Sequence, residues 1–484
     1  MVTPTSDVPA QVTPQLPLLD DHAVGRILDE AFQLLISPGV RVGTDTARQL
    51  LAAAGARIES VVAHIPEGLV RRCLECVPRE FFLHDRSGAP VVQYGGNRVQ
   101  FDPGSSCLNI LDPETRKPRP ARTEDLVRLV QVTEMLPQFA AQSTAVVCND
   151  VPHEIGDFYR LFVVLKHSNK PVVTGAFSGR TLGTMLDLLV ADAGSAAELK
   201  RKPRAVFDVC PSPPLNWSEF AADNLVQLAR AGVPVEMVSM PLAGATAPVT
   251  LAGSMVQHAA ECLSGITIHQ LAYPGAPIVW GGAPAIFDMS TGGTPMGAIE
   301  TAMLNLGCTQ VGKHLGLPTH GYLVASDSNS VDAQAGMESG TSAVLGALAG
   351  INMISGAGML DSLACHSVEK LVIDAEAIAS AQRLVEGIRM GAESLATDTF
   401  RQTGFSGEFL KLKETRSLFR TEQHFPSSIV ERGFANQGCP HDEFQRARQR
   451  ANELVASYEL PNIPAELKTK LDAILEKHTS GVTS

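Results

Sequence analysis

Alternation of strand-like and helix-like segments is the feature of this chain that most constrains its fold. Between residues 97 and 366, short apolar or β-branched runs each end in a cluster of Gly, Pro, Ser, Asp or Asn, and amphipathic stretches separate most of them. The runs are VQFDPG (99–104), TAVVCN (144–149), PVVTGAF (171–177), RAVFDVC (204–210), PVEMVSMPLAG (234–244), PIVWGG (277–282), HGYLVASD (320–327) and INMISGAG (351–358). Repetition of this kind is typical of a parallel sheet covered by helices.

Eight such units predict an α/β protein with a (β/α)₈ TIM-type barrel as its catalytic domain, at residues 97–366. The boundaries of the first two units depend on pattern alone, so an open doubly wound sheet is the alternative architecture.

N-terminal and C-terminal helical extensions are expected on either side of this barrel. Residues 18–96 contain three stretches with apolar side chains at helical spacing, and Pro38-Gly39 ends the first of them. Residues 367–484 open with VEKLVIDAEAIASAQRLVEGIRMGAESL (368–395), which predicts one long helix or two. Residues 1–17 lack any periodic pattern and are expected to be a disordered tail.

Composition narrows the partners and the compartment of this chain of 484 residues. A formal charge of −12 without a Lys/Arg block makes nucleic acid and anionic membranes poor partners. We find no apolar run long enough to span a bilayer, and the first residues lack the pattern of a secretory signal. The nine scattered cysteines favour reduced thiols and a cytoplasmic location. A large acidic barrel is also expected to form a homo-oligomer.

The candidate site residues follow from the rule that barrel chemistry lies at the carboxyl ends of the strands. The residues selected there are Phe177, Ser178, Asp208, Met240, Trp280, Gly281, Tyr322, Asp327, Asn329 and Ser355. A tryptophan face attracts a quaternary ammonium group by cation–π interaction, although a core position for Trp280 is an equal alternative. Asp327 directly follows an apolar run and is expected at the barrel mouth, whereas Ser330 or Asp332 is expected to cap the next helix.

Other motifs give no specific chemistry. Cys73 and Cys76 form a C-x-x-C pair without a second pair or a nearby histidine, so we expect no metal site. Gly179–Gly183 lacks a full G-x-G-x-x-G, and no nucleophile elbow is present. Residue patterns alone therefore predict a barrel with an aromatic and acidic pocket.

Three long segments extend this interpretation. They are MPLAGATAPVTLAGSMVQHAAECLSGITIHQLAYPGAPIVWGGAPAIFDMSTGG (240–293), LGLPTHGYLVASDSNSVDAQAGMESGTSAVLGALAGIN (315–352) and HSVEKLVIDAEAI (366–378). In order and spacing they resemble the trimethylamine methyltransferase family. The resemblance implies a barrel enzyme that moves a methyl group from a methylated amine to the cobalt of a separate corrinoid protein, with no cofactor bound permanently to the barrel.

Pyrrolysine, which the archetype of that family carries near the position of residues 320–326, is absent from this sequence. The chain therefore resembles the non-pyrrolysine branch, whose members demethylate quaternary amines such as glycine betaine. A quaternary ammonium already has a neutral amine as its leaving group, so the enzyme has to position the substrate, exclude water and admit the corrinoid. On this interpretation the catalytic candidates are Asp327, Tyr322 and His320, and the substrate-binding candidates are Trp280, Phe177, Asn329, Asp208 and Met240. Tyr322 and Trp280 would form aromatic walls, and Asp327 would supply a counter-charge.

Departures from the family pattern bear on the substrate. Asp327-Ser328-Asn329 stands where the family commonly has Asp-Ser-Lys, and His320–Leu323 lacks a common arginine. Leu412–Thr415 replaces a His-x-His-Thr run. Loss of a basic residue at the mouth is compatible with a substrate that has no carboxylate, or with a substrate that is held in a different way. The alternative functions are a cobalt-independent barrel enzyme acting on a small amine, and a catalytically silent protein that binds methylated amines.

Overall fold

A closed ring of parallel strands forms the centre of the molecule in the computed structural model, which describes residues 11–390, 395–433 and 442–479. The ring strands are β7 (Gln100–Pro103), β10 (Gln142–Ser143), β11 (Val172–Thr174), β12 (Ala205–Val209), β14 (Val235–Met237), β16 (Ile278–Val279), β18 (His320–Tyr322) and β19 (Met353–Ala357). They form a five-stranded sheet, β10-β11-β12-β14-β16, and a three-stranded sheet, β18-β19-β7. A parallel bridge between Trp280 and Thr319 joins the two sheets on one side, and a bridge between Cys107 and Val146 joins them on the other.

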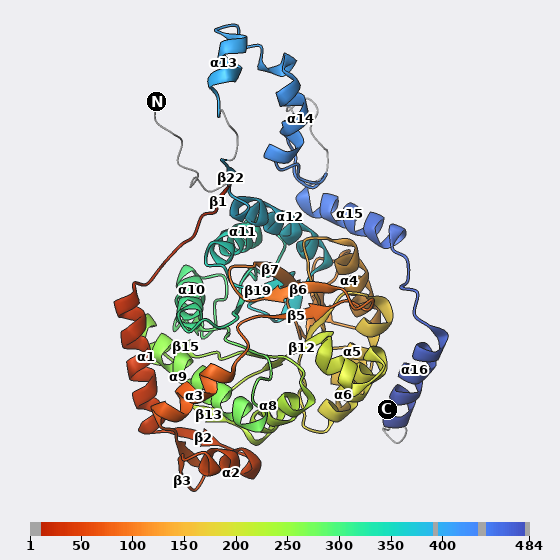
Figure 1. Ribbon diagram of the computed structural model, residues 1–484. Coiled ribbons are helices and arrows are strands. Elements are labelled where there is room, and N and C mark those ends of the chain that lie inside the picture. The colour runs from red at the N-terminus through yellow and green to blue at the C-terminus, as the bar shows by residue number, and fades with distance from the viewer. Residues whose placement is uncertain (1–10, 391–394, 434–441, 480–484) are drawn as a thin grey trace.

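Helices follow the strands and surround the ring (Figure 1). They are α4 (Thr123–Met135), α5 (Gly156–His167), α6 (Thr181–Ala193), α7 (Ala196–Arg201), α8 (Glu219–Ala231), α9 (Leu251–Ala272), α10 (Ile299–His314), α11 (Ala333–Leu348) and α12 (Val368–Val385). The predicted (β/α)₈ barrel is thereby confirmed. The second predicted run, at 144–149, begins just after β10 rather than on it.

A hairpin closes the amino-terminal end of the ring. Strands β5 (Phe81–His84) and β6 (Pro90–Tyr94) lie across the middle of the barrel in Figure 1. Their side chains form one apolar cluster with residues at the start of the ring strands. The cluster comprises Phe81, Leu83, Val92, Tyr94, Ala141, Val173, Val206, Val279 and Met353. The hairpin therefore covers the amino-terminal end of the lumen.

The amino-terminal segment contains the three expected helices, α1 (Asp21–Ile36), α2 (Asp45–Ala53) and α3 (Glu67–Cys76). It is not purely helical, however, because β2 (Val40–Val42), β3 (Arg57–Glu59) and β4 (Val62–His64) form a sheet with β13 (Asn216–Trp217). Strands of three residues are too short to display a two-residue alternation, so the sequence pattern does not reveal them.

Further short strands form small sheets separate from the ring. Strands β8 (Asn109–Leu111), β9 (Pro118–Pro120), β20 (Met359–Leu360) and β21 (Cys365–His366) form one small sheet, and β15 (Leu242–Ala243) pairs with β17 (Ala285–Ile286).

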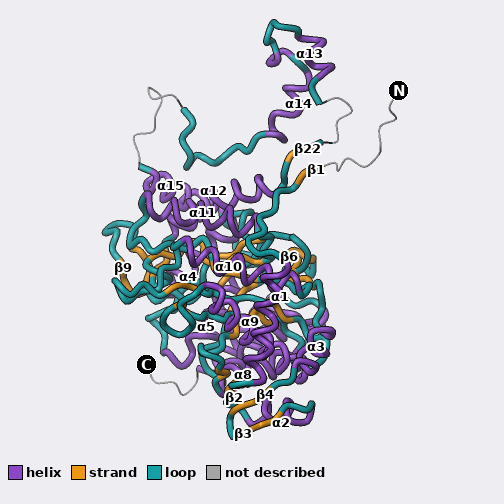
Figure 2. The backbone as a smooth tube through the Cα atoms, turned by 90° about the vertical axis from the view of Figure 1, so that its left-hand side faces the viewer, coloured by secondary structure: helices purple, strands orange, loops and turns teal. Residues whose placement is uncertain are grey.

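The carboxyl-terminal segment departs from the barrel and then returns to it. Strand β22 (Ile388–Arg389) pairs with β1 (Gln11–Val12), so part of the expected disordered tail is ordered, while residues 1–10 lie outside the described residues. Helices α13 (Thr397–Thr403) and α14 (Lys413–Glu422) project away from the ring, and α15 (Glu443–Ser457) and α16 (Ala465–Thr479) run back along its side (Figures 1 and 2). Among the described helices, none has the length and apolarity to cross a membrane.

Candidate functional site

Alternation along the ring strands decides which side chains face the lumen. Val173, Val206, Val279 and Met353 belong to the cluster under the hairpin, so they point inward. Successive side chains of a strand point to opposite faces, and residues two positions apart share a face. The next inward layer therefore contains Gly175, Asp208, Gly281 and Ser355.

Contacts across the ring identify the centre of this layer. Glu236 Oε2 lies 3.8 Å from His320 Nε2, although strand β16 separates β14 from β18 in the ring. Such a contact can form only through the lumen. One ligand-type atom from each of Asp208, Glu236 and His320 lies within 4.8 Å of the other two.

A hydrogen-bond network fixes these groups. The Tyr94 hydroxyl of the hairpin donates to Glu236 Oε1. The Ser355 hydroxyl donates to Asp102 Oδ1 at 2.6 Å and lies 3.0 Å from His320 Nε2. Because the single hydroxyl proton of Ser355 is directed at Asp102, the proton in the second contact belongs to His320 Nε2. The Nδ1 atom of His320 is then an unprotonated acceptor, and it has no hydrogen-bond partner in the described chain.

The lumen therefore holds three carboxyl groups, from Asp102 on β7, Asp208 on β12 and Glu236 on β14. Within the described residues, no lysine or arginine forms an ion pair with any of them. Burial raises the pKa of Asp208 to about 7, and burial together with the neighbouring Asp208 charge raises the pKa of Glu236 well above its usual range. Burial also raises the pKa of Asp102. Loss of solvation therefore favours the protonated forms of these carboxyl groups.

His320 is neutral in this setting. Burial lowers its pKa to about 3, because the loss of solvation disfavours the imidazolium. Two carboxylates and one neutral imidazole also form a donor set that a divalent ion such as Zn²⁺ accepts. No metal site is predicted from the sequence. The three members of this triad stand on three different strands, so no local motif brings them together. One usable signal was a lone acidic residue inside an apolar run, as with Glu236 in PVEMVSM.

The lumen widens toward the carboxyl end. Asp208 keeps partial solvent exposure and Cys210 is exposed, so both border open space. A Cβ added at Gly175 would come no closer than 3.4 Å to any atom, the nearest being the Asp208 carbonyl oxygen. A Cβ at this position would therefore make ordinary contact with Asp208 rather than clash with it. The ring of Tyr322 meets the ring of His320 edge-on, with 5.6 Å between centroids, and forms one wall of this space.

Of the residues predicted from the sequence, the structure brings Asp208, His320 and Tyr322 together in the lumen. Phe177 lies beyond the end of β11, is 49 % exposed, and covers the guanidinium of Arg160 at 4.5 Å. Met240 is half-buried beyond the end of β14. Both therefore lie at the carboxyl end of the barrel.

Trp280 does not belong to this pocket, and its expected role as an aromatic wall is wrong. Val279 faces the lumen, so Trp280 points outward. Its side chain is 1 % exposed, and its Nε1 donates to the Cys308 carbonyl at 2.9 Å. A Cβ at Gly312 would lie 2.5 Å from the Trp280 ring, which shows how closely α10 packs on it. Trp280 is a core residue between the ring and α10.

Asp327 likewise faces away from the lumen. Its carboxylate accepts hydrogen bonds from the backbone N–H groups of Met296 and Gly297, at 2.7 and 2.9 Å, and from the Ser362 hydroxyl at 2.9 Å. These contacts tether a loop, so the expected counter-charge position is wrong, and residues 280, 322 and 327 share no pocket. Asn329 is exposed on the same loop.

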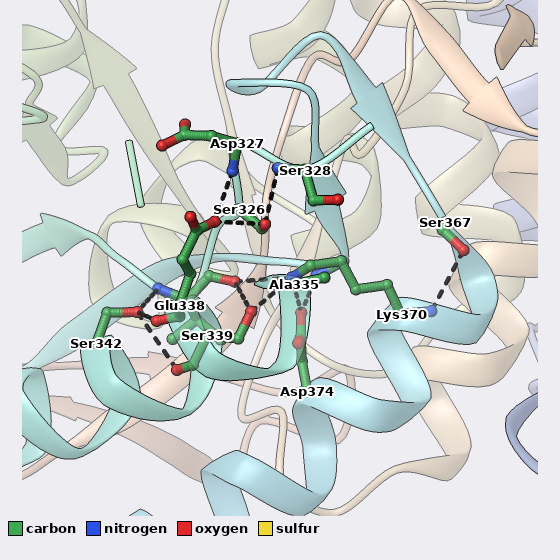
Figure 3. A network of polar contacts seen from close by, with 12 residues as sticks. Ser326, Asp327, Ser328, Ala335, Glu338, Ser339, Ser342, Ser367, Lys370 and Asp374 are labelled. Atoms are coloured by element: carbon green, nitrogen blue, oxygen red, sulfur yellow. Dashed lines mark hydrogen bonds and ion pairs between the residues drawn. The ribbon is translucent and has the colours of Figure 1, made fainter. Parts of the chain in front are cut away.

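The polar residues that follow β18 instead form hydrogen bonds with other parts of the protein (Figure 3). Glu338 on α11 accepts hydrogen bonds from the Ser326 hydroxyl and the Asp327 backbone N–H. Lys370 on α12 donates to the Val324 carbonyl at 3.1 Å and pairs with Asp374 at 2.6 Å. As expected, a residue of this stretch, Asp332, caps α11 by accepting from the Ala335 N–H.

A family model described as "Trimethylamine methyltransferase (MTTB)" matches residues 2–483 of the chain. The chain belongs to the trimethylamine methyltransferase family. It is 29 % identical to the trimethylamine methyltransferase of Desulfitobacterium hafniense, over 94 % of this chain and 93 % of that protein. It is 31 % identical to that of Methanosarcina thermophila, over 86 % of each chain.

A glycine betaine methyltransferase from Desulfitobacterium hafniense is also similar, at 27 % identity over 96 % of this chain and 98 % of that protein. Among solved structures, the monomethylamine methyltransferase of Methanosarcina barkeri has a TM-score of 0.49 and 12 % identity, over 93 % of this chain and 97 % of that one. That likeness is too distant to draw anything from. Membership of the trimethylamine methyltransferase family makes this protein a methyltransferase, and its standard amino acids place it with the non-pyrrolysine branch.

Proposed function

We propose that this protein moves a methyl group from a quaternary or tertiary methylamine to the Co(I) of a partner corrinoid protein. The observation that carries the proposal is the set of carboxyl groups at Asp102, Asp208 and Glu236, which face one lumen without a basic partner in the described chain; Asp102 and Glu236 are buried, and Asp208 is partly exposed. Buried charges are normally paired, so this arrangement calls for a cation. Family membership supplies the reaction class.

The lumen suits an ammonium group. A unit positive charge 4 Å from an ionised carboxylate gains about 4 kcal/mol at the effective dielectric of 20 typical of such sites. Tyr322 adds an aromatic face, whose attraction for a cation is about 0.5–2 kcal/mol. The neutral His320 avoids the repulsion that an imidazolium would cause.

The transfer itself requires position rather than acid–base chemistry. The electron pair of Co(I) forms the new bond to the methyl carbon while the carbon–nitrogen bond breaks, and its electron pair remains on nitrogen. A quaternary substrate leaves as a neutral amine, so no proton has to move during the step. The positive charge on nitrogen is lost in this step, so the neutral amine is attracted less strongly to the carboxyl groups, which favours its release.

The open end of the barrel would admit the partner. Exposed apolar side chains stand on the loops that follow the ring strands, and we call this set the rim: Leu108, Phe177, Val249 and Met289. Val249 and Met289 are close neighbours, since a Cβ at Gly244 would meet both within 3.6 Å. Exposed apolar residues gathered around one opening are typical of an interaction site. A partner docked there would exclude water and bring the cobalt to the substrate methyl.

The test uses the full-length protein with reduced free cob(I)alamin and a panel of betaines, carnitines, choline and methylamines, followed by the spectrum of methylcobalamin. We expect substrate-dependent methylation that falls by about 100-fold or more in Asp208→Asn, because the lumen loses its counter-charge. The matched control Asp187→Asn removes an exposed carboxylate on α6 and should leave the rate unchanged.

Two outcomes would contradict the proposal. Consumption of an amine without any corrinoid would identify a cobalt-independent enzyme. Saturable amine binding without transfer to cob(I)alamin or to a corrinoid protein would identify a binding protein.

A further inference from the structure

We infer that the barrel lumen binds a divalent transition-metal ion, such as Zn²⁺, through Asp208, Glu236 and His320. One carboxylate oxygen or imidazole nitrogen from each residue lies within 4.8 Å of the other two. The three residues stand on β12, β14 and β18. The metal site itself is independent of the proposed function, and only the role of the ion in methyl transfer rests on that function.

The first support is that each of the three side chains keeps one donor atom without a hydrogen-bond partner. These atoms are Asp208 Oδ1, Glu236 Oε2 and His320 Nδ1, and no group of the described chain bonds to them. Glu236 is fully buried and His320 is 3 % exposed. A buried polar atom that stays unpaired costs about 1–3 kcal/mol. One metal ion that accepts a lone pair from each atom removes all three deficits.

The second support is that two of these groups are already held from behind. The Tyr94 hydroxyl donates to Glu236 Oε1. The Nε2–H of His320 is directed at the Ser355 hydroxyl, 3.0 Å away, and that hydroxyl donates to Asp102 Oδ1 at 2.6 Å. Metal ligands are characteristically bonded in this way on their far side, because the second contact fixes the orientation of a carboxylate and the tautomer of an imidazole. His320 thus presents an unprotonated Nδ1 to the ion.

The third support is the placement of the three strands. Asp208 and Glu236 are register partners on the adjacent parallel strands β12 and β14. His320 approaches across the lumen, with 3.8 Å between its Nε2 and Glu236 Oε2. Ligand atoms about 2.1 Å from a tetrahedral ion lie roughly 3.4 Å from one another, so side-chain rotations close the three groups on it.

Charge balance separates a divalent ion from an ammonium group as the occupant of this triad. Ionised Asp208 and Glu236 carry two negative charges, and neither has a basic partner among the described residues. A divalent ion neutralises both, whereas one ammonium leaves an uncompensated charge. The imidazole of His320 favours an ion such as Zn²⁺ over Mg²⁺ or Ca²⁺, which prefer oxygen ligands.

Three protein ligands leave a fourth position open, as in catalytic rather than structural metal sites. The hairpin covers the amino-terminal end of the lumen, whereas Asp208 is partly exposed toward the carboxyl end. In the proposed methyl transfer, the open position takes a lone pair from a substrate oxygen or a neutral amine, since a quaternary nitrogen has none. Asp102 stays outside the triad with its Oδ2 unpaired and buried, so its charge remains available to an ammonium group.

The experiment uses the full-length protein, freed of metal by dialysis against a chelator and then titrated with Zn²⁺ alone. We expect about one equivalent per chain by calorimetry and elemental analysis, because the site closes around a single ion. X-ray absorption at the zinc edge should show nitrogen and oxygen ligands without sulfur. His320→Gln should lose the bound equivalent, and the matched control His153→Gln, at an exposed histidine, should keep it.

A second variant leaves all three ligands in place. Tyr94→Phe removes the hydrogen bond to Glu236 Oε1, so the affinity for Zn²⁺ should fall about tenfold or more. Circular dichroism and thermal unfolding check that the variants fold, and Glu236→Gln replaces His320→Gln if the latter does not fold.

The inference is overturned if neither Zn²⁺ nor Mn²⁺ binds stoichiometrically, or if His320→Gln keeps the ion. A sulfur ligand would also overturn it, because the ion would then sit at a cysteine. Metal binding and methyl transfer are separate readouts. Zn²⁺ binding without transfer to cob(I)alamin would refute the proposed function alone, and full methyl transfer by the chelated protein would refute the role of the ion alone.

Discussion

At the scale of single residues, neighbouring positions on one strand have opposite roles. Val279 lies in the lumen under the hairpin, while Trp280 lies between the ring and α10 and bonds to the Cys308 carbonyl. On β18, His320 faces Glu236 across the barrel. Whether a residue stands at an odd or an even position along the strand therefore says more about its role than its chemical type does.

Replacing Trp280 by Ala should lower stability without changing ligand affinity. A buried tryptophan contributes through packing, and its loss typically costs about 3–5 kcal/mol. Urea unfolding measures this change, and choline titration of the folded variant measures affinity. Tyr322→Ala, on the lumen side, should show the opposite pattern, with weaker binding and a smaller loss of stability. A stable Trp280→Ala variant with weakened binding would contradict the core assignment.

At the scale of elements, α11 and α12 hold the carboxyl ends of β18 and β19 in place. Lys370 on α12 donates to the Val324 carbonyl and the Ser339 hydroxyl, and its partner Asp374 accepts from the Gly358 N–H at 2.7 Å. Val324 has a φ of 63°, which is unfavourable for a β-branched residue. The two helices thus stabilise a strained turn directly above His320 and Tyr322. The SDSNSVDAQAG and VEKLVIDAE segments supply the residues of this connection.

Lys370→Met should destabilise the fold by about 3–5 kcal/mol, because it leaves the buried Asp374 without its counter-charge. The double variant Lys370→Met/Asp374→Leu should recover part of that loss, since no charge then remains buried. Lys470→Met is the matched control, because Lys470 and Glu466 form a pair with the same spacing at the surface. Solvent screens such an exposed pair, so its loss should change stability little. Equal losses in the buried and exposed variants would refute this role for Lys370.

At the scale of the whole molecule, the two ends of the barrel have different tasks. The β5–β6 hairpin seals the amino end, and the rim surrounds the opening at the carboxyl end. The carboxyl-terminal helices α13 and α14 lie outside the ring and leave that division intact (Figures 1 and 2). In the proposed function, substrate and corrinoid would therefore arrive from the same side.

Met289→Asp should reduce methyl transfer to the partner corrinoid protein by about tenfold or more, since a charge in a docking surface loses apolar burial and is itself desolvated. Transfer to free cob(I)alamin should be unchanged, because the lumen is intact. Leu410→Asp changes an equally exposed apolar residue outside the barrel and serves as the control. If Met289→Asp slows both acceptors equally, or neither, the partner does not dock on the rim.

The sequence by itself determined the architecture and the reaction class. Eight apolar runs separated by helical stretches led to the closed barrel, and three long segments led to the trimethylamine methyltransferase family, which the family match confirms. Helix ends marked by Gly39 and Asp332 were also readable. Periodicity and capping are local properties, so they can be seen in one stretch of chain.

Only the tertiary structure decided which residues face the lumen. Both faces of a barrel strand are buried, so its sequence reads as a continuous apolar run and carries no inward or outward direction. Asp102 and Glu236 were missed for this reason, and Trp280 was placed on the wrong face. Ring closure then brought together side chains that lie far apart in the sequence, and burial without a basic partner gave the carboxyl groups their unusual affinity for protons.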